Sequence, residues 1–183
     1  MAVYQESGLE VDLPDHQIFR FCDCTAYRRL SSYSLKEMDF GWWDNQASTL
    51  WLMELKDYSR LALEDKLPNN LFGNFVDKAT DSLMMLAAVW SNSEHGQALG
   101  RCLPTPCTSF PQQPHEIKLV FVLKLESQQL LTQLSALSVR LRNRLRGRIA
   151  LFNMSMTDLI LLDHMTAIRA GLPIKIPSTD SLP

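Results

Sequence analysis

Two neighbouring stretches decide the fold: residues 36–43, KEMDFGWW, and residues 49–58, TLWLMELKDY, separated by a polar turn over residues 44–48. The two stretches predict strands over 35–44 and 49–58. On the second strand, Trp51, Met53 and Leu55 fall on one face, and Leu50, Leu52, Glu54 and Lys56 fall on the other. Glu54 and Lys56 are two apart on the second strand. Their side chains therefore leave the same face of the sheet, with Cα atoms ~6.6 Å apart.

The turn also predicts the register of this hairpin. A turn centred between Gln46 and Ala47 pairs residues whose numbers sum to 93, so Asp39 lies opposite Glu54. Opposed residues have Cβ atoms ~4.5–5.5 Å apart. The rival carboxylate, Asp44, would instead oppose Thr49, ~17 Å along the strand from Glu54. Two carboxylates as close as Asp39 and Glu54 repel each other unless a cation lies between them.

Two carboxylates and a lysine at the edge of a sheet predict a magnesium site. Mg²⁺ takes one or two protein carboxylates, keeps several waters and uses substrate phosphate oxygens for the rest. It lowers the pKa of a bound water and neutralises charge on a scissile phosphate. Lys56 would orient the attacking water or stabilise the developing charge.

The pattern of Asp39 followed by Glu54-x-Lys56 resembles the catalytic motif of the PD-(D/E)xK nuclease superfamily, which includes restriction enzymes and Holliday-junction resolvases. The resemblance implies a restriction-endonuclease-like αβββαβ core with a mixed central sheet flanked by helices. It implies that Asp39 and Glu54 bind Mg²⁺ or Mn²⁺ and that Lys56 is the catalytic lysine. Met38 stands where the motif has proline. An acidic residue from a first helix often completes such sites, and Glu6 and Glu10 are both candidates.

The short motif Asp/Glu-x-Lys is not specific by itself, and it occurs three times in this chain. Glu64-x-Lys66 lies in a polar stretch with no strand to align it. Glu116-x-Lys118 opens a strand, but its upstream partner would fall in a proline-rich loop. Only Glu54-x-Lys56 has a hairpin partner. The alternative interpretation of that pair is a solvated ion pair on an edge strand.

The remaining pattern predicts one α/β domain over residues 1–183, with a core of about 16–125 and a helical extension of about 127–170. We expect a loose lead-in or a short helix over the first 15 residues, a strand over 16–24, and a helix from Asn74 to Trp90. On that helix Lys78 and Asp81 would flank the site. The prediction continues with a structureless connector over 91–116 and a strand over 117–125. A helix capped by Ser127, a strand over 149–154 and a last helix from 157 to Gly171 complete it.

Arginines occupy alternate positions from 140 to 148, with no acidic residue between Glu126 and Asp158. If Leu141 and Leu145 face the core of a helix, Arg140, Arg142 and Arg146 are exposed. Such a cluster suits contact with phosphates of a nucleic acid. A solvated helix face or a dock for a protein partner is the alternative.

The composition of the chain limits which partners and sites it can have. The chain has 183 residues, 46% of them hydrophobic, and a net charge of −2, so any nucleic-acid surface must be local. No apolar run is as long as a membrane span, and no membrane partner is expected. The polar N-terminus predicts a cytoplasmic protein whose four cysteines are reduced. A zinc site formed by the Cys22/Cys24 and Cys102/Cys107 pairs is disfavoured by its spacing.

These observations predict a metal-dependent nuclease that hydrolyses phosphodiester bonds, with DNA favoured over RNA. A chain of this length has room for little beyond a catalytic core, so a protein partner or a second copy would supply specificity or activation. The alternative is a non-catalytic module that keeps the nuclease fold and binds nucleic acid or protein. A third interpretation is an unrelated α/β subunit in which the Glu–Lys pair has no role.

Overall fold

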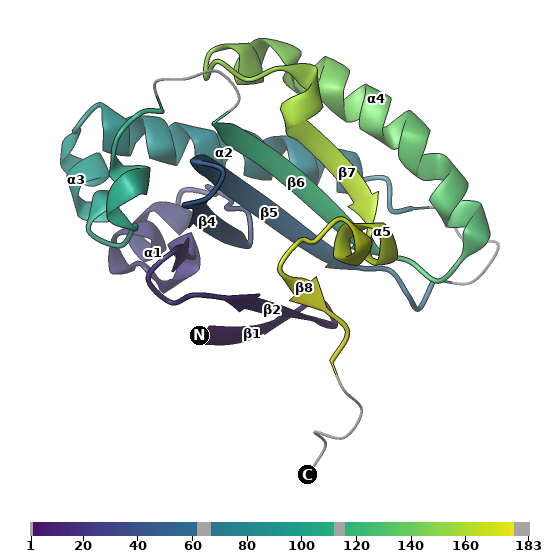
Figure 1. Ribbon diagram of the computed structural model, residues 1–183. Helices are drawn as coiled ribbons and strands as arrows, with labels where there is room; N and C mark the ends of the chain where they lie inside the picture. Colours follow the sequence, from purple (N-terminus) through teal and green to yellow (C-terminus); the bar gives the residue numbers. More distant parts are fainter. Residues whose placement is uncertain (1, 62–66, 112–115, 178–183) are drawn as a thin grey trace.

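The computed structural model describes residues 2–61, 67–111 and 116–177, which form two β-sheets and their covering helices (Figure 1). The first half contains β1 (Ala2–Glu6), β2 (Leu9–Leu13), β3 (Ile18–Phe19), η1 (Phe21–Asp23), α1 (Thr25–Ser31), β4 (Phe40–Asp44), β5 (Thr49–Asp57) and α2 (Leu71–Trp90). The second half contains α3 (Glu94–Gly100), η2 (Thr105–Thr108), β6 (Ile117–Lys124), α4 (Gln128–Ala150), η3 (Met156–Asp158), β7 (Leu159–Asp163), α5 (His164–Arg169) and β8 (Ile174–Lys175).

A mixed five-stranded sheet forms the centre of the molecule. Its strand order is β3-β4-β5-β6-β7, with β3, β4 and β5 antiparallel and β5, β6 and β7 parallel. The chain passes from β5 to β6 through α2 and α3, and from β6 to β7 through α4, as parallel neighbours require. The predicted α/β class, with a mixed sheet flanked by helices, is therefore confirmed.

The two faces of this sheet are covered differently. One face packs against α1, α2, α3 and α4, and its core includes Leu50 and Leu52 of β5. The other packs against α5 and a small antiparallel sheet of order β1-β2-β8, through Met53 and Leu55. Figure 1 shows α2 and α4 on one side of the central sheet and the small sheet on the other. The alternation predicted for residues 49–58 decides which β5 side chain enters which core.

The loose lead-in or short helix predicted for the first 15 residues is wrong, because they form the β1–β2 hairpin. Ser7 and Gly8 make its turn, with φ angles of 51° and 67°. Two consecutive positive φ angles are typical of a tight two-residue hairpin turn. The strand predicted over 16–24 is reduced to β3, and η1 and α1 follow it.

Two predictions in the middle of the chain also need correction. α2 begins at Leu71, after its N-cap residue Asn70, and therefore starts earlier than the predicted Asn74. The connector predicted to be structureless contains α3 and η2. Ser93 caps α3 by accepting a hydrogen bond from the backbone of Gly96, a local signal that the prolines of this segment obscured.

The C-terminal part is not purely helical. The strand predicted over 149–154 is wrong, since α4 continues to Ala150 and the fifth strand is β7. The last helix is limited to α5, whose N-cap Asp163 accepts from the backbone of Thr166. Asp158 closes a capping box with Ser155 at η3. These two acids mark helix starts on either side of an apolar run, and that run forms the strand.

The prediction that all four cysteines are reduced is wrong as well. Cys24, next to α1, and Cys102, after α3, form a disulfide with Cα atoms 5.8 Å apart. Cys22 and Cys107 are free thiols. The sequence spacing groups each cysteine with its nearest neighbour in the chain. The contact between α1 and α3 instead brings together two cysteines that are 78 positions apart.

Of the described helices, none is both long and apolar enough to cross a bilayer.

Candidate active site

The β4–β5 hairpin has the predicted register. Phe40 pairs with Met53, Trp42 with Trp51 and Asp44 with Thr49, so paired residue numbers sum to 93. Asp39 directly precedes the first pair and therefore reaches the sheet edge opposite Glu54. Its Oδ2 accepts a hydrogen bond of 2.8 Å from the backbone of Leu55, which fixes the orientation of the carboxylate at the end of the ladder.

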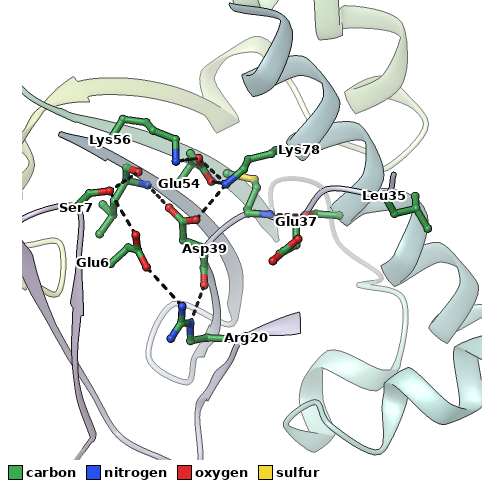
Figure 2. Close-up of polar contacts among 12 residues, drawn as sticks. Glu6, Ser7, Arg20, Leu35, Glu37, Asp39, Glu54, Lys56 and Lys78 are labelled. Carbon is green, nitrogen blue, oxygen red and sulfur yellow. Dashed lines mark hydrogen bonds and ion pairs between the residues drawn. The ribbon is translucent and has the colours of Figure 1, made fainter. Parts of the chain in front are cut away.

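Asp39, Glu54 and Lys56 converge as predicted (Figure 2). The Nζ of Lys56 lies 2.7 Å from Oε1 of Glu54. The side chain of Glu54 is fully buried, whereas those of Asp39 and Lys56 are 12% and 29% exposed. A fully buried carboxylate requires strong partners, so this pair is not the solvated edge-strand pair of the alternative interpretation.

Lys78 of α2 joins the group from the helix layer. Its Nζ lies 3.1 Å from Oδ1 of Asp39 and 2.7 Å from Oε1 of Glu54. Of the two flanking residues considered on α2, Lys78 thus reaches the carboxylates. Asp81 instead accepts a hydrogen bond of 2.9 Å from the backbone of Lys36. We call Asp39, Glu54, Lys56 and Lys78 the carboxylate–lysine cluster.

α2 also holds the segment that leads into Asp39. Besides the bond from Lys36 to Asp81, the backbone of Met38 donates to the hydroxyl of buried Ser82 at 2.9 Å. The Nζ of Lys36 bonds to Asp77, one turn earlier on the helix, at 2.8 Å. The polar side of α2 therefore positions the strand entry that carries Asp39, in addition to supplying Lys78.

The β1–β2 turn lies on the other side of the cluster. Ser7 donates from its hydroxyl to the carbonyl of Leu55 at 3.0 Å. Arg20 donates to the carbonyl of Asp39 at 3.3 Å and lies 3.5 Å from a carboxylate oxygen of Glu6. Figure 2 shows Glu6 and Ser7 beside Asp39 and Arg20. Between the two acidic candidates, the structure brings Glu6 to the margin of the site from a strand rather than a helix.

Glu10 is directed elsewhere. It forms an ion pair of 2.6 Å with Lys175 of β8, within the small sheet. Glu37, another acidic residue near the site, accepts a hydrogen bond from the hydroxyl of Tyr27. Burial raises the pKa of Glu37, and the negative charge of Asp39 also raises it. Its place two residues before Asp39 on the strand entry is the only sequence signal for it.

Burial dominates the electrostatics of Glu54 and raises the pKa of this carboxyl to about 7. The negative charge of Asp39 raises it further, and the positive charges of Lys78 and Lys56 oppose the shift. Burial lowers the pKa of the Lys78 ammonium, but the charges of Glu54 and Asp39 outweigh that effect, so its pKa lies above the ordinary value. The cluster therefore keeps Lys78 charged near neutral pH.

The donor chemistry of Asp39 and Glu54 fits Mg²⁺. Both residues offer hard carboxylate oxygens to a common point, now taken by the Lys78 ammonium, and Mg²⁺ requires no more than one or two protein carboxylates. In the described ranges, no group of three or more His, Cys, Asp or Glu side chains could hold a metal ion. Waters and a substrate phosphate would have to supply the remaining ligands.

The arginines expected on α4 do not form one uniform face. Arg140 and Arg146 are exposed as predicted. Arg142 is half-buried and donates from Nε and an Nη to the carbonyl of Leu159, at 3.2 and 3.1 Å. Its predicted exposure is wrong because its guanidinium ties α4 to β7. The guanidinium of Arg140 lies 4.9 Å from the centre of the Phe72 ring.

Of the two rival motifs, only Glu116-x-Lys118 lies within the described residues. Glu64 and Lys66 lie outside the described residues. Lys118 of β6 packs its ammonium against the ring of Trp51, 4.9 Å from the ring centre, on the face opposite Glu54. Comparison with protein-family models, with curated proteins and with solved structures found no match for this chain. The case for a function therefore rests on the site itself.

Proposed function

We propose that this protein is a metal-dependent nuclease of the PD-(D/E)xK type that hydrolyses phosphodiester bonds of DNA or RNA with Mg²⁺ or Mn²⁺. The observation that carries the proposal is the convergence of Asp39 and Glu54, from adjacent strands, on a single cation. Lys56 lies beside them on the strand of Glu54. Structural ion pairs seldom need a fully buried carboxylate with two lysines, because burial of charge is costly.

The order of elements agrees with this proposal. The antiparallel strands β3, β4 and β5, then α2, then the parallel strand β6 follow the βββαβ part of a restriction-endonuclease-like core. The chain differs from that core in three respects. α3 and η2 are inserted between α2 and β6. α1 lies between β3 and β4, and within residues 2–17 the hairpin of β1 and β2 takes the place of a first helix.

Each residue of the cluster has a distinct part in the proposed reaction. Asp39 Oδ1 and the Glu54 carboxylate would hold the metal, and the backbone of Leu55 keeps Asp39 turned toward it. When bound, Mg²⁺ supplies charge neutralisation at the phosphate and lowers the pKa of water. Lys56 Nζ would orient the water whose oxygen bonds to phosphorus while the phosphorus–oxygen ester bond breaks. The water gives up one proton, and the leaving oxygen takes up one proton.

Direct cleavage assays test this proposal. Plasmid DNA, single-stranded DNA, duplex DNA and RNA are incubated with the protein and Mg²⁺ or Mn²⁺. We expect cleavage of at least one substrate and its loss in Glu54→Gln, because a neutral amide keeps the size but not the charge that holds the metal. Glu116→Gln, which alters the same motif outside the cluster, is the matched control and should cleave normally. Absence of cleavage on every substrate, or full activity of Glu54→Gln, would refute the proposal.

A non-catalytic module that keeps the nuclease fold is the second candidate. The observation that favours it is the charge balance of the cluster, in which Lys56 and Lys78 neutralise Asp39 and Glu54 without a metal. A module of this kind would bind nucleic acid in the presence of EDTA as well as with Mg²⁺. It would leave every substrate intact in the assay above.

A further inference from the structure

The Lys78 ammonium lies where the proposed metal would bind. Its Nζ contacts Oδ1 of Asp39 and both carboxylate oxygens of Glu54, at distances of 2.7 to 3.1 Å. Lys78 therefore bridges the two carboxylates with one ammonium group. Figure 2 shows the ammonium reaching from α2 to the two carboxylates of the β4–β5 hairpin.

The charges of the cluster make a metal and Lys78 mutually exclusive. Two carboxylates and two ammonium groups are electrically balanced. A divalent cation added to this balanced group would introduce two positive charges beside Lys78. At separations of a few Å in a partly buried site, this repulsion is only weakly screened by water. A metal therefore needs the ammonium to leave.

The Lys78 side chain is not sealed in the core. It is 19% exposed, so part of it already contacts solvent. The four-carbon stem of lysine is flexible, and its ammonium is a compact charge that regains strong hydration in water. The carboxylates are held more firmly, since Asp39 accepts from the backbone of Leu55 and Glu54 projects from the centre of β5.

We propose that Lys78 is a built-in counter-ion that occupies the cation position between Asp39 and Glu54 and competes with divalent metal for it. This inference rests on the proposed function, because it concerns the same metal position. Its consequence is that the free protein binds metal weakly and that loss of the Lys78 charge strengthens metal binding.

Calorimetric titration with Mn²⁺ measures this competition. We expect Lys78→Met to bind Mn²⁺ at least about tenfold more tightly than the wild type, a change of ~1.4 kcal/mol. Lys175→Met is the matched control, because Lys175 is also an ion-paired lysine, but it pairs with Glu10 and Asp12 in the small sheet, outside the cluster. It should bind as the wild type does. Equal or weaker binding by Lys78→Met, or no binding at all, would overturn the inference.

A second measurement uses the wild type and does not depend on the folding of a variant. Lysines are acetylated with an amine-reactive reagent, with and without saturating Mn²⁺, and the modified residues are quantified by mass spectrometry. We expect Mn²⁺ to increase the acetylation rate of Lys78 several-fold and to leave that of Lys175 unchanged. An unchanged rate at Lys78 would show that metal does not displace it.

The two proposals fail in different ways. If Lys78→Met tightens Mn²⁺ binding but no nucleic acid is cleaved by any form of the protein, the proposed function fails and the counter-ion role stands. If the wild type cleaves while Lys78→Met binds Mn²⁺ no more tightly, the counter-ion role fails and the nuclease stands.

Discussion

The carboxylate–lysine cluster and the arginines of α4 were both predicted as charged functional groups, but the fold treats them differently. In the cluster, charges of both signs are buried or half-buried and meet within 2.7 to 3.1 Å. On α4, like charges separate: Arg140 packs on Phe72, Arg142 binds a backbone carbonyl and Arg146 is exposed. The register of the β4–β5 hairpin determines which charged side chains of the cluster meet. On α4, by contrast, the contacts of each arginine depend on the residues that happen to pack beside it.

The largest effect is expected from Lys56→Ala in the cluster. Loss of a positive charge aimed at the reacting water should lower the cleavage rate about 10²–10³-fold, the range found when one stabilising group is removed. Metal affinity should not fall, because Asp39 and Glu54 keep their charges. Single-turnover cleavage and Mn²⁺ titration of the same sample separate the two quantities. A variant that cleaves at the wild-type rate would contradict the role given to Lys56.

The buried Glu54 should make the stability of the protein depend on pH. Its pKa is raised to about 7 in the fold, so the folded state binds this proton more tightly than the unfolded chain does. The contribution is therefore fully present below the ordinary carboxyl pKa of about 4.5 and is lost as pH rises through about 7. The loss is on the order of 3 kcal/mol.

Urea unfolding at several pH values, for the wild type and Glu54→Gln, isolates this contribution. The difference between the two free energies of unfolding should change between pH 4.5 and 7 and level off above that window. Subtracting the variant removes other groups that titrate in both proteins, such as Glu37. If the difference in free energy of unfolding is constant between pH 4.5 and 7, burial does not raise the pKa of Glu54.

The same contrast explains what could be predicted from the sequence. The convergence of Asp39, Glu54 and Lys56 follows from a local hairpin, because one short turn fixes the pairing of both strands. Lys78 lies 24 residues beyond Glu54 on a helix, so its approach depends on how α2 packs, which periodicity alone does not determine. The sequence made Lys78 and Asp81 equal candidates for a place beside the carboxylates, and only the packing of α2 determines that Lys78 reaches them.

The other differences between the predicted and the observed structure also have specific causes. The Ser7–Gly8 turn is a recognised hairpin signal, but the polar composition of the first 15 residues obscured it. β7 consists of four apolar residues followed by Asp163, and sequence periodicity cannot distinguish so short an apolar run from a helix segment. The Cys24–Cys102 bond depends on the contact between α1 and α3. β7 and the disulfide are fixed by tertiary packing, whereas the hairpin turn was already present in the local pattern.

Arg142 should act on stability rather than on binding. Its two hydrogen bonds to the carbonyl of Leu159 join α4 to the edge strand β7. Arg142→Gln should lower the free energy of unfolding by about 1–3 kcal/mol, because the carbonyl loses a charged donor. Arg146→Gln on the same helix is the control and should change stability by less than ~0.5 kcal/mol, as exposed substitutions do. Thermal or urea unfolding of both variants measures the difference.

The smallest effect concerns nucleic-acid affinity of the exposed pair Arg140 and Arg146. Each phosphate neutralised on duplex DNA contributes ~0.9 to the slope of log affinity against log salt concentration, because condensed counter-ions are released. Replacing both arginines with glutamine should flatten the slope by up to ~2. Binding is measured by fluorescence anisotropy with labelled duplex DNA in EDTA, so that cleavage does not interfere. The control is a double variant in which Arg101 and Arg169, which are exposed at other places in the fold, are replaced with glutamine. It has the same change in net charge. If both double variants flatten the slope equally, only net charge matters, and if neither does, the α4 arginines serve a protein partner or solvent instead of phosphate.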